Sequence, residues 1–488
     1  MPHDIQGFFE TLQVHARHRG AQPAVQGAGE SFTYEQLLCE VRQRAGWLRE
    51  QPPGTFALAL ENGPQALLWD LAALLAERPC LLLPGFFSAA QRRHCLVQGG
   101  VTRVLADAGL AAELSDCGFT QDARFWSRDS VASPPLPDGT AKITYTSGST
   151  GAPKGVCLGA AALVRVAHEL EVASRATAPG KYLAVLPLAV LLENLGVYAA
   201  LLAGASVVLY PQAQLGIGGA SQVNFSRLLG AIALSGAESL ILVPQLLLGL
   251  VTAIERGAMR VGPLRFVAVG GARVADSLLS RAAAVGLPVY EGYGLSECAS
   301  VVCLNRPGAL RPGSVGRPLP HVQVRIAEDG EVLVAGTALL GYLGEPAFDG
   351  QWWPTGDLGQ LDRDGYLHLA GRKKNQFITS FGRNVNPEWV EAELTQGGVI
   401  GQAFVHGEGL PGNLALLWPL DPQASDEQVA TAVRQCNDRL PDYARVHAWR
   451  RLPEPFSAEA GTLTANGRPR RDVILRHYQS LLSDLQYP

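Results

Sequence analysis

Residues 143–155, with the sequence ITYTSGSTGAPKG, concentrate the groups that can bind phosphate oxygens. A strand-like start leads into a loop whose glycines free backbone N–H groups, which favour anions. The candidate ligands, which add several hydroxyls and one cation, are Thr146, Ser147, Gly148, Ser149, Thr150, Gly151 and Lys154. The spacing G-x-x-x-x-G-K-[ST] is absent, which excludes a Walker P-loop. We favour a polyphosphate site over an ordinary surface loop.

Four further segments suit a nucleotide when they are taken together. Gly270-Gly271-Ala272 follows an apolar strand-like run, and YEGYGLSE begins at residue 290. Farther on, WPTGD ends at Asp357, whose carboxylate offers paired acceptors, and GRKK ends at Lys374. Each segment has an ordinary interpretation on its own, because glycine turns, core tyrosines and turn-terminating aspartates are common. Their order and spacing along one chain are not explained by chance.

In this order the segments closely resemble the core motifs of the adenylate-forming superfamily, which includes acyl-CoA synthetases, luciferases and the adenylation domains of peptide synthetases. The resemblance spans roughly residues 30–475. It implies that the 146–151 loop and Lys154 hold the phosphates of ATP, and that Thr150 and Glu297 hold Mg²⁺. It also implies a nucleotide site made by Gly270, Gly271, Ala272, Glu291, Gly292, Tyr293, Gly294, Ser296, Asp357 and Arg372. In that site Tyr293 is expected to stack on adenine, while Asp357 and Arg372 bind the ribose.

Two segments most resemble the long-chain fatty acyl-CoA synthetase branch of this superfamily. One covers residues 371–391, and the other is LPLAVLLE, which carries Val190 where that branch usually has histidine. The resemblance places in the acyl pocket Val190, Leu191, Glu193 and Asn194. Relatives that activate amino acids have an aspartate near Leu191 to hold the ammonium. Because an unpaired ammonium would be costly in this apolar run, an apolar acid is favoured.

The main departure from the superfamily lies near the end of the chain, in the run TLTANGRPRR. Arg468 stands where the family has a lysine that reaches the substrate carboxylate and the α-phosphate. Arginine keeps the positive charge, but its planar fork differs in geometry from an ammonium. Three interpretations remain: Arg468 serves in a reshaped site, adenylation is slow and tuned to one substrate, or another cation acts. We favour the first.

The resemblance implies ATP-dependent activation of a small-molecule carboxylic acid to an acyl-AMP, with Mg²⁺ as the metal and pyrophosphate as the leaving group. The acyl group would then pass to a thiol, either of coenzyme A or of the phosphopantetheine arm of an acyl carrier protein. Lys374 is expected to be the hinge of a mobile C-terminal domain, with Gly382 and Arg383 near the incoming thiol. The alternatives are a stand-alone amino-acid or aryl-acid adenylation enzyme of an assembly line and a catalytically silent nucleotide-binding homologue.

The hydrophobic pattern of the chain indicates the strands and helices that could position these segments. Apolar runs of strand length alternate with helical patterns up to about residue 290, which predicts mostly parallel sheets covered by helices. These runs include 56–60, 79–83, 101–106, 183–186, 207–210, 239–243 and 264–269. Short strands between Gly, Asp and Pro turns predict an antiparallel β subdomain after residue 310. We therefore expect the α/β adenylate-forming fold, with two αβ subdomains and a β subdomain in residues 1–373 and a small, mobile α+β domain in 374–488.

Three helix starts are indicated by capping residues. Thr33 with Gln36, and Ser425 with Gln428, have the spacing of a capping box. Asn386 followed by Pro387 suits an N-cap and a first helical position. The sequence therefore predicts helices that begin directly after residues 33, 386 and 425.

The composition of the chain limits the class of protein, the partners and the location that can be expected. The chain has 488 residues, 47% of them hydrophobic and 17% charged, which predicts a globular protein of several domains. A net charge of −4 gives no sign of a nucleic-acid or membrane-surface binder. Eight cysteines without a CxxC pair, and a start without a signal-peptide pattern, favour a cytoplasmic location. Residues 182–211 are apolar, yet Pro187, Glu193 and Asn194 near the middle favour a buried strand–helix–strand unit over a membrane span.

Overall fold

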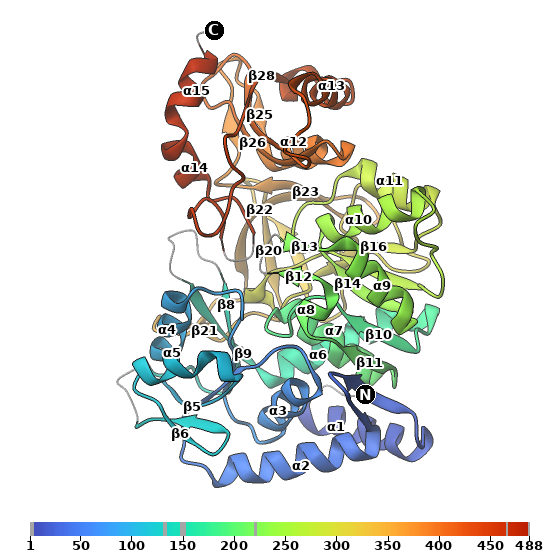
Figure 1. The fold of residues 1–488 in the computed structure, drawn as a ribbon, viewed down its shortest axis with the longest axis vertical. Coiled ribbons are helices and arrows are strands. Elements are labelled where there is room, and N and C mark those ends of the chain that lie inside the picture. Colours follow the sequence, from blue (N-terminus) through green and yellow to red (C-terminus); the bar gives the residue numbers. More distant parts are fainter. Residues whose placement is uncertain (1–3, 130–133, 147–152, 219–221, 465–466, 487–488) are drawn as a thin grey trace.

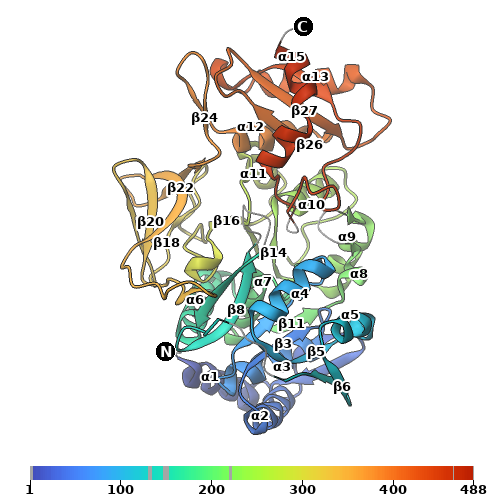
Figure 2. The same ribbon diagram turned by 90° about the vertical axis from the view of Figure 1, so that its left-hand side faces the viewer.

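The computed structural model describes residues 4–129, 134–146, 153–218, 222–464 and 467–486 (Figure 1). Two β-sheets with their helices form the lower body of the molecule in this view. Figure 2 shows a small β subdomain to one side of this body and the C-terminal elements above it.

The larger sheet has the strand order β18–β17–β16–β15–β14–β10–β11–β1–β2 and is parallel from β16 to β1. Its strands are β1 (Pro23–Gly27), β2 (Glu30–Thr33), β10 (Lys181–Ala184), β11 (Ser206–Leu209), β14 (Ser239–Leu242), β15 (Phe266–Val269), β16 (Val289–Tyr293), β17 (Cys303–Leu304) and β18 (Arg317–Pro318). The parallel middle confirms the prediction from alternating strand and helix patterns. Antiparallel pairs extend the sheet at both edges.

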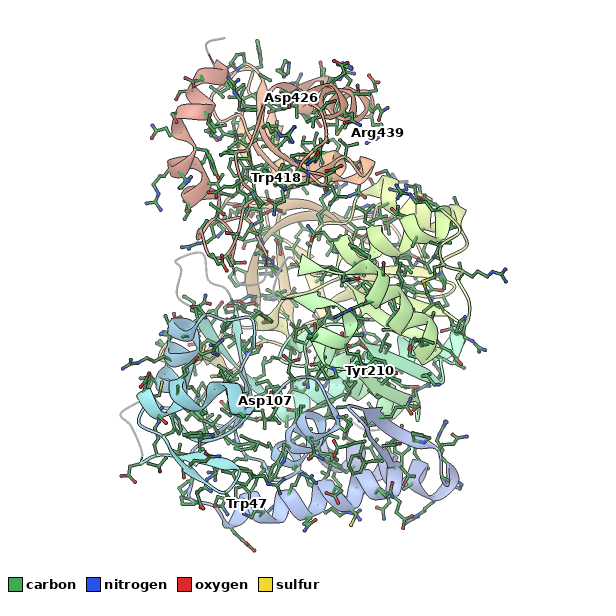
Figure 3. The ribbon with its side chains drawn as sticks, in the orientation of Figure 1. Trp47, Asp107, Tyr210, Trp418, Asp426 and Arg439 are labelled. Atoms are coloured by element: carbon green, nitrogen blue, oxygen red, sulfur yellow. The ribbon has the colours of Figure 1, made fainter. Side chains whose placement is uncertain are left out.

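The second sheet has the order β21–β9–β8–β4–β3–β5–β7–β6 and is parallel from β8 to β5. Its strands are β3 (Thr55–Ala59), β4 (Cys80–Leu82), β5 (Val101–Ala106), β6 (Thr120–Asp122), β7 (Phe125–Ser127), β8 (Thr140–Thr146), β9 (Lys154–Gly159) and β21 (Gly341–Tyr342). The two sheets approach each other where Asp107 follows β5 and Tyr210 follows β11 (Figure 3). Glu61 links this region, because its backbone N–H donates to Asp107 at 2.7 Å and its carboxylate accepts from the Gln212 N–H at 3.2 Å.

Helices cover both sheets and fill the space between them. They are α1 (Ile5–His18), α2 (Tyr34–Glu50), α3 (Pro64–Leu75), α4 (Ala89–Gln98), α5 (Ala111–Asp116), α6 (Ala160–Ser174), α7 (Leu191–Leu202), α8 (Gln212–Leu215), α9 (Phe225–Ser235), α10 (Pro244–Glu255) and α11 (Asp276–Ala284). Nearly every residue of α7 is buried, as expected of a helix that is apolar all round. The predicted strand–helix–strand unit in 182–211 is therefore confirmed as β10, α7 and β11. Among the described residues, the structure has no helix long and apolar enough to cross a membrane.

The β subdomain is antiparallel, as predicted. It contains β19 (Gln323–Ile326), β20 (Glu331–Ala335), β22 (Trp353–Leu361) and β23 (Leu367–Arg372). The C-terminal lobe, which we define as the elements after β23, contains β24 (Phe377–Ile378), β25 (Asn384–Val385), α12 (Pro387–Leu394), β26 (Ile400–His406), β27 (Asn413–Pro419), α13 (Asp426–Asn437), β28 (Val446–Arg451), α14 (Arg471–His477) and α15 (Gln479–Gln486). Two short strands, β12 (Ile217–Gly218) and β13 (Gln222–Val223), pair antiparallel in the body.

All three predicted helix starts are confirmed. Thr33 and Ser425 cap α2 and α13 in complete capping boxes, and the Asn386 side chain caps α12. The N-terminal helix α1 was not predicted.

The C-terminal lobe docks on α11 of the body through α12. Glu393 of α12 accepts a 3.1 Å hydrogen bond from the Ser277 hydroxyl and lies 3.8 Å from the guanidinium of Arg439, which Figure 3 places on the lobe. Arg281 of α11 also donates to the Gln396 carbonyl at 3.0 Å. Asp426, at the start of α13, lies in the upper part of the lobe, and Trp418 lies lower, toward the body (Figure 3).

Candidate active site

Glycines shape the carboxyl ends of β15 and β16. Gly271 has a φ of +83°, in the left-handed region that glycine adopts without strain. A Cβ on Gly270 would lie 3.1 Å from the Gly292 carbonyl oxygen, and one on Gly294 would overlap the Ser300 carbonyl. These strand ends therefore present backbone to the space above them, in the position where ligands bind to open α/β sheets. Ala272 lies exposed directly after the turn.

Three side chains from different strands meet above these glycines. The Tyr293 hydroxyl donates a 2.7 Å hydrogen bond to Asp357, and the Arg372 Nε lies 3.0 Å from the other carboxylate oxygen. Arg372 also donates to the Thr355 carbonyl at 3.0 Å. Burial raises the pKa of Asp357, while Arg372 and the Tyr293 hydrogen bond oppose that shift. Burial and the nearby carboxylate raise the pKa of Tyr293, so its hydroxyl stays a donor.

A second group of side chains connects Lys154 to Glu297. The Tyr342 hydroxyl donates a 2.8 Å hydrogen bond to Glu297. The Lys154 ammonium lies 4.8 Å from the centre of the Tyr342 ring and 3.0 Å from Glu345. Tyr342 thus joins a cation and a carboxylate from two distant segments. Sequence reasoning missed this residue, because β21, which carries it, pairs with β9 across more than 180 residues.

The phosphate-binding candidates are described only at their two ends. Thr146 ends β8 and Lys154 begins β9, and the two residues are paired in the antiparallel ladder. The other candidates, which lie outside the described residues, are Ser147, Gly148, Ser149, Thr150 and Gly151. Within the described part of the chain, no group of three or more His, Cys, Asp or Glu side chains could hold a metal ion. Of the two predicted metal ligands, Glu297 is described and Thr150 lies outside the described residues.

Arg468 reaches this region from the C-terminal lobe. Its guanidinium donates a 2.8 Å hydrogen bond to the Gly271 carbonyl. Its backbone N–H is held by the Thr464 hydroxyl at 3.0 Å. The charges that act on it include those of Asp357 and Glu297. The lobe therefore places a cation beside the turn that follows β15.

An elongated cavity of about 220 Å³ begins beside Arg468 and Tyr293 and continues between the larger sheet and α7. Ser296 lies at its mouth, and Val190 and Leu191 line the wall formed by the start of α7. The lining is mostly apolar. An acid with a carboxylate at Arg468 and an apolar tail along α7 would match this distribution.

Glu193 and Asn194 are not among the residues that line the cavity. Glu193 is fully buried and accepts hydrogen bonds from the Tyr182 hydroxyl at 2.5 Å and the Leu186 N–H at 2.8 Å. Burial raises the pKa of Glu193 to about 8. Asn194 donates to Asp70 at 2.7 Å, on the opposite side of α7 from the cavity.

Asp70 is the centre of a buried polar network that the sequence analysis did not identify. Its carboxylate lies 2.8 Å from the Lys142 ammonium and accepts a 2.7 Å hydrogen bond from the Tyr198 hydroxyl. Lys142 also donates to Asn194 at 2.5 Å. The network joins α3, β8 and α7, so it connects the sheet that carries Lys154 to the helix that lines the cavity.

The remaining predicted residues lie around this centre. Glu291 is on β16, where burial raises its pKa to about 8 and Arg273 opposes the shift. Lys374 lies exposed in the turn after β23. Gly382, with a φ of +69°, and Arg383 lie exposed in the turn between β24 and β25, away from the cavity lining.

Comparisons with known proteins agree with this arrangement. The family described as AMP-binding enzyme matches residues 12–345, and the family described as AMP-binding enzyme C-terminal domain matches residues 374–486. A long-chain-fatty-acid–CoA ligase from Mycobacterium bovis is 33% identical over 249 residues, which cover 45% of this chain and 41% of the relative. The match therefore spans less than half the length of that relative. A 2-succinylbenzoate–CoA ligase from Bacillus licheniformis is 28% identical over 417 residues, which cover 79% of this chain and 83% of the relative.

Solved structures share the whole fold. The anthranilate CoA ligase AuaEII in complex with anthranoyl-AMP has a TM-score of 0.80 at 18% identity, and the comparison covers 98% of both chains. O-succinylbenzoate coenzyme A synthetase from Bacillus subtilis in complex with AMP has a TM-score of 0.73 at 21% identity, over 95% of this chain and 97% of the other. The predicted fold class is confirmed.

Proposed function

Because the chain belongs to the AMP-binding enzyme family, we propose that it uses ATP to convert an apolar carboxylic acid into an acyl-AMP. The acyl group then passes to a thiol. One observation carries the proposal: an apolar cavity ends at the turn of Gly270 and Gly271, at Tyr293, whose hydroxyl donates to the buried Asp357, and at the Arg468 cation. The acid would place its carboxylate at Arg468 and its tail between α7 and the larger sheet.

The nucleotide would bind above the strand ends. Adenine fits against the backbone at Gly270 and Gly271, beside the ring of Tyr293. Among the described residues, one oxygen of Asp357 accepts from Tyr293 and the other pairs with Arg372, and the remaining lone pairs can accept from ribose hydroxyls. Lys154 would approach the phosphates together with the glycine-rich loop. Mg²⁺, when bound near Glu297, would neutralise phosphate charge.

The chemistry requires positioning and positive charge more than a protein nucleophile. A substrate carboxylate oxygen bonds to the α-phosphorus while the bond from that phosphorus to the bridging oxygen breaks, and pyrophosphate leaves. Two anions must approach each other, so cations at Arg468 and Lys154 would stabilise the transition state. Cys298, next to Glu297, is fully buried and burial raises its pKa, which suits packing and not nucleophilic attack.

For the second step we propose coenzyme A as the acceptor, supported by the names of the relatives; the phosphopantetheine of a carrier protein is the alternative. Lys374 would be the hinge between residues 1–373 and 374–488, and Gly382 and Arg383 would approach the thiol after the lobe turns. A cytoplasmic location is proposed on the eight cysteines, all of which are unpaired.

Acid-dependent exchange between ATP and pyrophosphate tests the proposal directly. A panel of fatty, aryl and amino acids is offered to the purified chain with Mg²⁺. Exchange with apolar acids is the expected result. Exchange with amino or aryl acids alone would favour an assembly-line enzyme, as the names of the succinylbenzoate and anthranilate relatives suggest for aryl acids. Absence of exchange with every acid, despite ATP binding, would indicate a silent homologue.

A further inference from the structure

We propose that the substrate is an unbranched monocarboxylic acid that lies along α7, and that Ala199 and Ala203 limit its length. This inference rests on the proposed function, because it specifies the substrate class of the same site. It is carried by the length, width and charge of the cavity.

The cavity exists because both of its walls carry small residues. On α7 the lining residues Gly196, Ala199, Ala200 and Ala203 recur at helical spacing and share one face. On the sheet the facing positions include Ser239, Ala268 and Gly270. A helix and a sheet normally interdigitate large side chains at close-packed density, so small residues on both walls leave a continuous space. A bound acyl chain would fill that space.

The length of the cavity suits a chain and exceeds what a single ring needs. Between Leu192 and Ala203, both of which line the cavity, α7 rises about 16 Å. The facing strand spans about 10 Å between Phe266 and Val269, which leaves Gly270 to the nucleotide. With C–C bonds of about 1.5 Å in an extended zigzag, roughly eight to a dozen carbons cover these distances. The end of the cavity away from Arg468 is lined by small residues from α6, from the end of α7 and from the loops beside them: Ser174, Pro179, Ala203 and Ala205.

The width of the cavity favours an unbranched tail. Beside Gly196 the side chains of Ile241 and Tyr182 narrow the space between the helix and the sheet, since a Cβ on Gly196 would lie 2.6 Å from both the Ile241 Cδ1 and the Tyr182 hydroxyl. Tyr182 cannot swing away freely, because its hydroxyl is bonded to the buried Glu193. Glu193 therefore acts on the cavity indirectly, by holding the side chain that narrows it.

The charge distribution excludes a second carboxylate. Of the described residues that line the cavity, Arg468 at the mouth is the one with a charged side chain. A distal carboxylate would be buried without a partner at the far end, which is costly. Diacids and succinylbenzoate-like acids should therefore be rejected.

The test is a chain-length profile of acid-dependent ATP–pyrophosphate exchange with the full chain. The acids are butyrate, octanoate, laurate and palmitate, with benzoate, anthranilate, 2-succinylbenzoate and dodecanedioate for comparison. We expect a maximum at octanoate or laurate. The kcat/KM for laurate should exceed that for benzoate and that for dodecanedioate by tenfold or more. The loss of several apolar contacts, or the burial of one unpaired polar group, has an effect of about this size.

Two substitutions test the length limit. Ala203→Leu fills the far end and is expected to reduce kcat/KM for laurate by about tenfold relative to kcat/KM for butyrate. Ala199→Leu fills the middle and should move the optimum to still shorter acids. Butyrate turnover reports that each variant is folded and that its nucleotide site is intact. Ala233→Leu, on an exposed face of α9 outside the cavity, is the matched control and should leave the profile unchanged.

Displacement of a fluorescent unbranched fatty acid measures the same selectivity without turnover. Displacement by laurate but not by benzoate or dodecanedioate supports the inference. A preference for aryl acids or diacids overturns the inference while the proposed function stands. An Ala203→Leu chain-length profile that is parallel to the wild-type profile does the same. Absence of exchange with every acid overturns the proposed function and this inference with it.

Discussion

The guanidinium of Arg468 and the carbonyl of Gly271 form a 2.8 Å hydrogen bond across 197 residues of sequence. This contact joins the C-terminal lobe to the carboxyl end of β15. It places a cation at the end of a cavity whose other described lining residues are uncharged, and near the carboxylates of Asp357 and Glu297. Under the proposed function, this orientation of the lobe lets Arg468 meet an acid bound in the cavity.

Arg468→Ala is expected to slow acyl-AMP formation by about 10²–10³, because it removes a preorganised donor and a charge from the reacting centre. Arg468→Lys should retain part of the rate, since it keeps the charge but not the planar fork. Single-turnover formation of acyl-AMP measures the effect. Arg476→Ala, at an exposed position on α14, is the control. A rate for Arg468→Ala within twofold of wild type would assign the role to another cation.

Tyr342→Phe is expected to weaken binding of ATP in the presence of Mg²⁺ by about tenfold, in the range found for residues that orient a metal ligand. The variant removes the hydrogen bond to Glu297 but keeps the ring beneath Lys154. Calorimetric titration of ATP with and without Mg²⁺ separates the two contributions. Tyr342→Leu, which also removes the ring, should weaken binding even without the metal. Equal affinities for wild type and Tyr342→Phe at every Mg²⁺ concentration would contradict this role.

Lys374→Pro is expected to impair thiol transfer more than adenylation. Lys374 lies in the turn between β23 and β24, and proline there fixes φ and removes a backbone N–H, which restricts rotation of the lobe. Thioester formation and acyl-AMP formation are measured separately on the same preparation. Lys374→Ala controls for loss of the side chain alone. Equal losses in both steps would count against a hinge at this position.

Helix starts and strands could be predicted from the sequence because they depend on residues that are close together in the chain. The capping box at Thr33 and Gln36 depends on residues three apart, and it is present as expected. The parallel strands follow from apolar runs of limited length. The extra strand β9 was missed because its start at Lys154 lies in a segment read as a loop, and its partner β8 precedes that loop.

The interior of the site could not be predicted in the same way. Because α7 is apolar all round, its sequence does not say which face lines a cavity and which face packs. Glu193 was expected in the acyl pocket, and its side chain instead holds Tyr182 and the Leu186 backbone. The pairing of Lys142 with Asp70 joins elements 72 residues apart, and no local pattern indicates it.

The buried pair of Lys142 and Asp70 gives a stability prediction. Lys142→Met leaves the Asp70 carboxylate buried without its cation and is expected to cost about 3–5 kcal/mol in the free energy of unfolding. The double variant Lys142→Met/Asp70→Leu removes both charges and should recover part of this loss. Chemical denaturation followed by fluorescence compares the three proteins. A double variant that is no more stable than Lys142→Met would contradict this account.

Glu193 predicts a specific dependence of stability on pH. Burial raises its pKa to about 8 from an ordinary value of 4.5, so between these values the folded chain binds a proton that the unfolded chain releases. The contribution of Glu193 to the free energy of unfolding must therefore fall as the pH rises through this window. Glutamine cannot lose a proton, and its amide can still donate to Tyr182 and accept from the Leu186 N–H. The Tm of wild type relative to Glu193→Gln should accordingly decrease from pH 5 to pH 8.

Thermal unfolding of both proteins at pH 5, 6.5 and 8 measures this difference. Glu459→Gln, at an exposed position, is the control and should run parallel to wild type across the series. Parallel profiles for Glu193→Gln and wild type would show that Glu193 titrates alike in the folded and unfolded chains. In that case the Glu193 carboxyl would be ionised beside Tyr182 at neutral pH. The hydrogen bond between the two side chains would then be charge-assisted and stronger than the neutral hydrogen bond expected here.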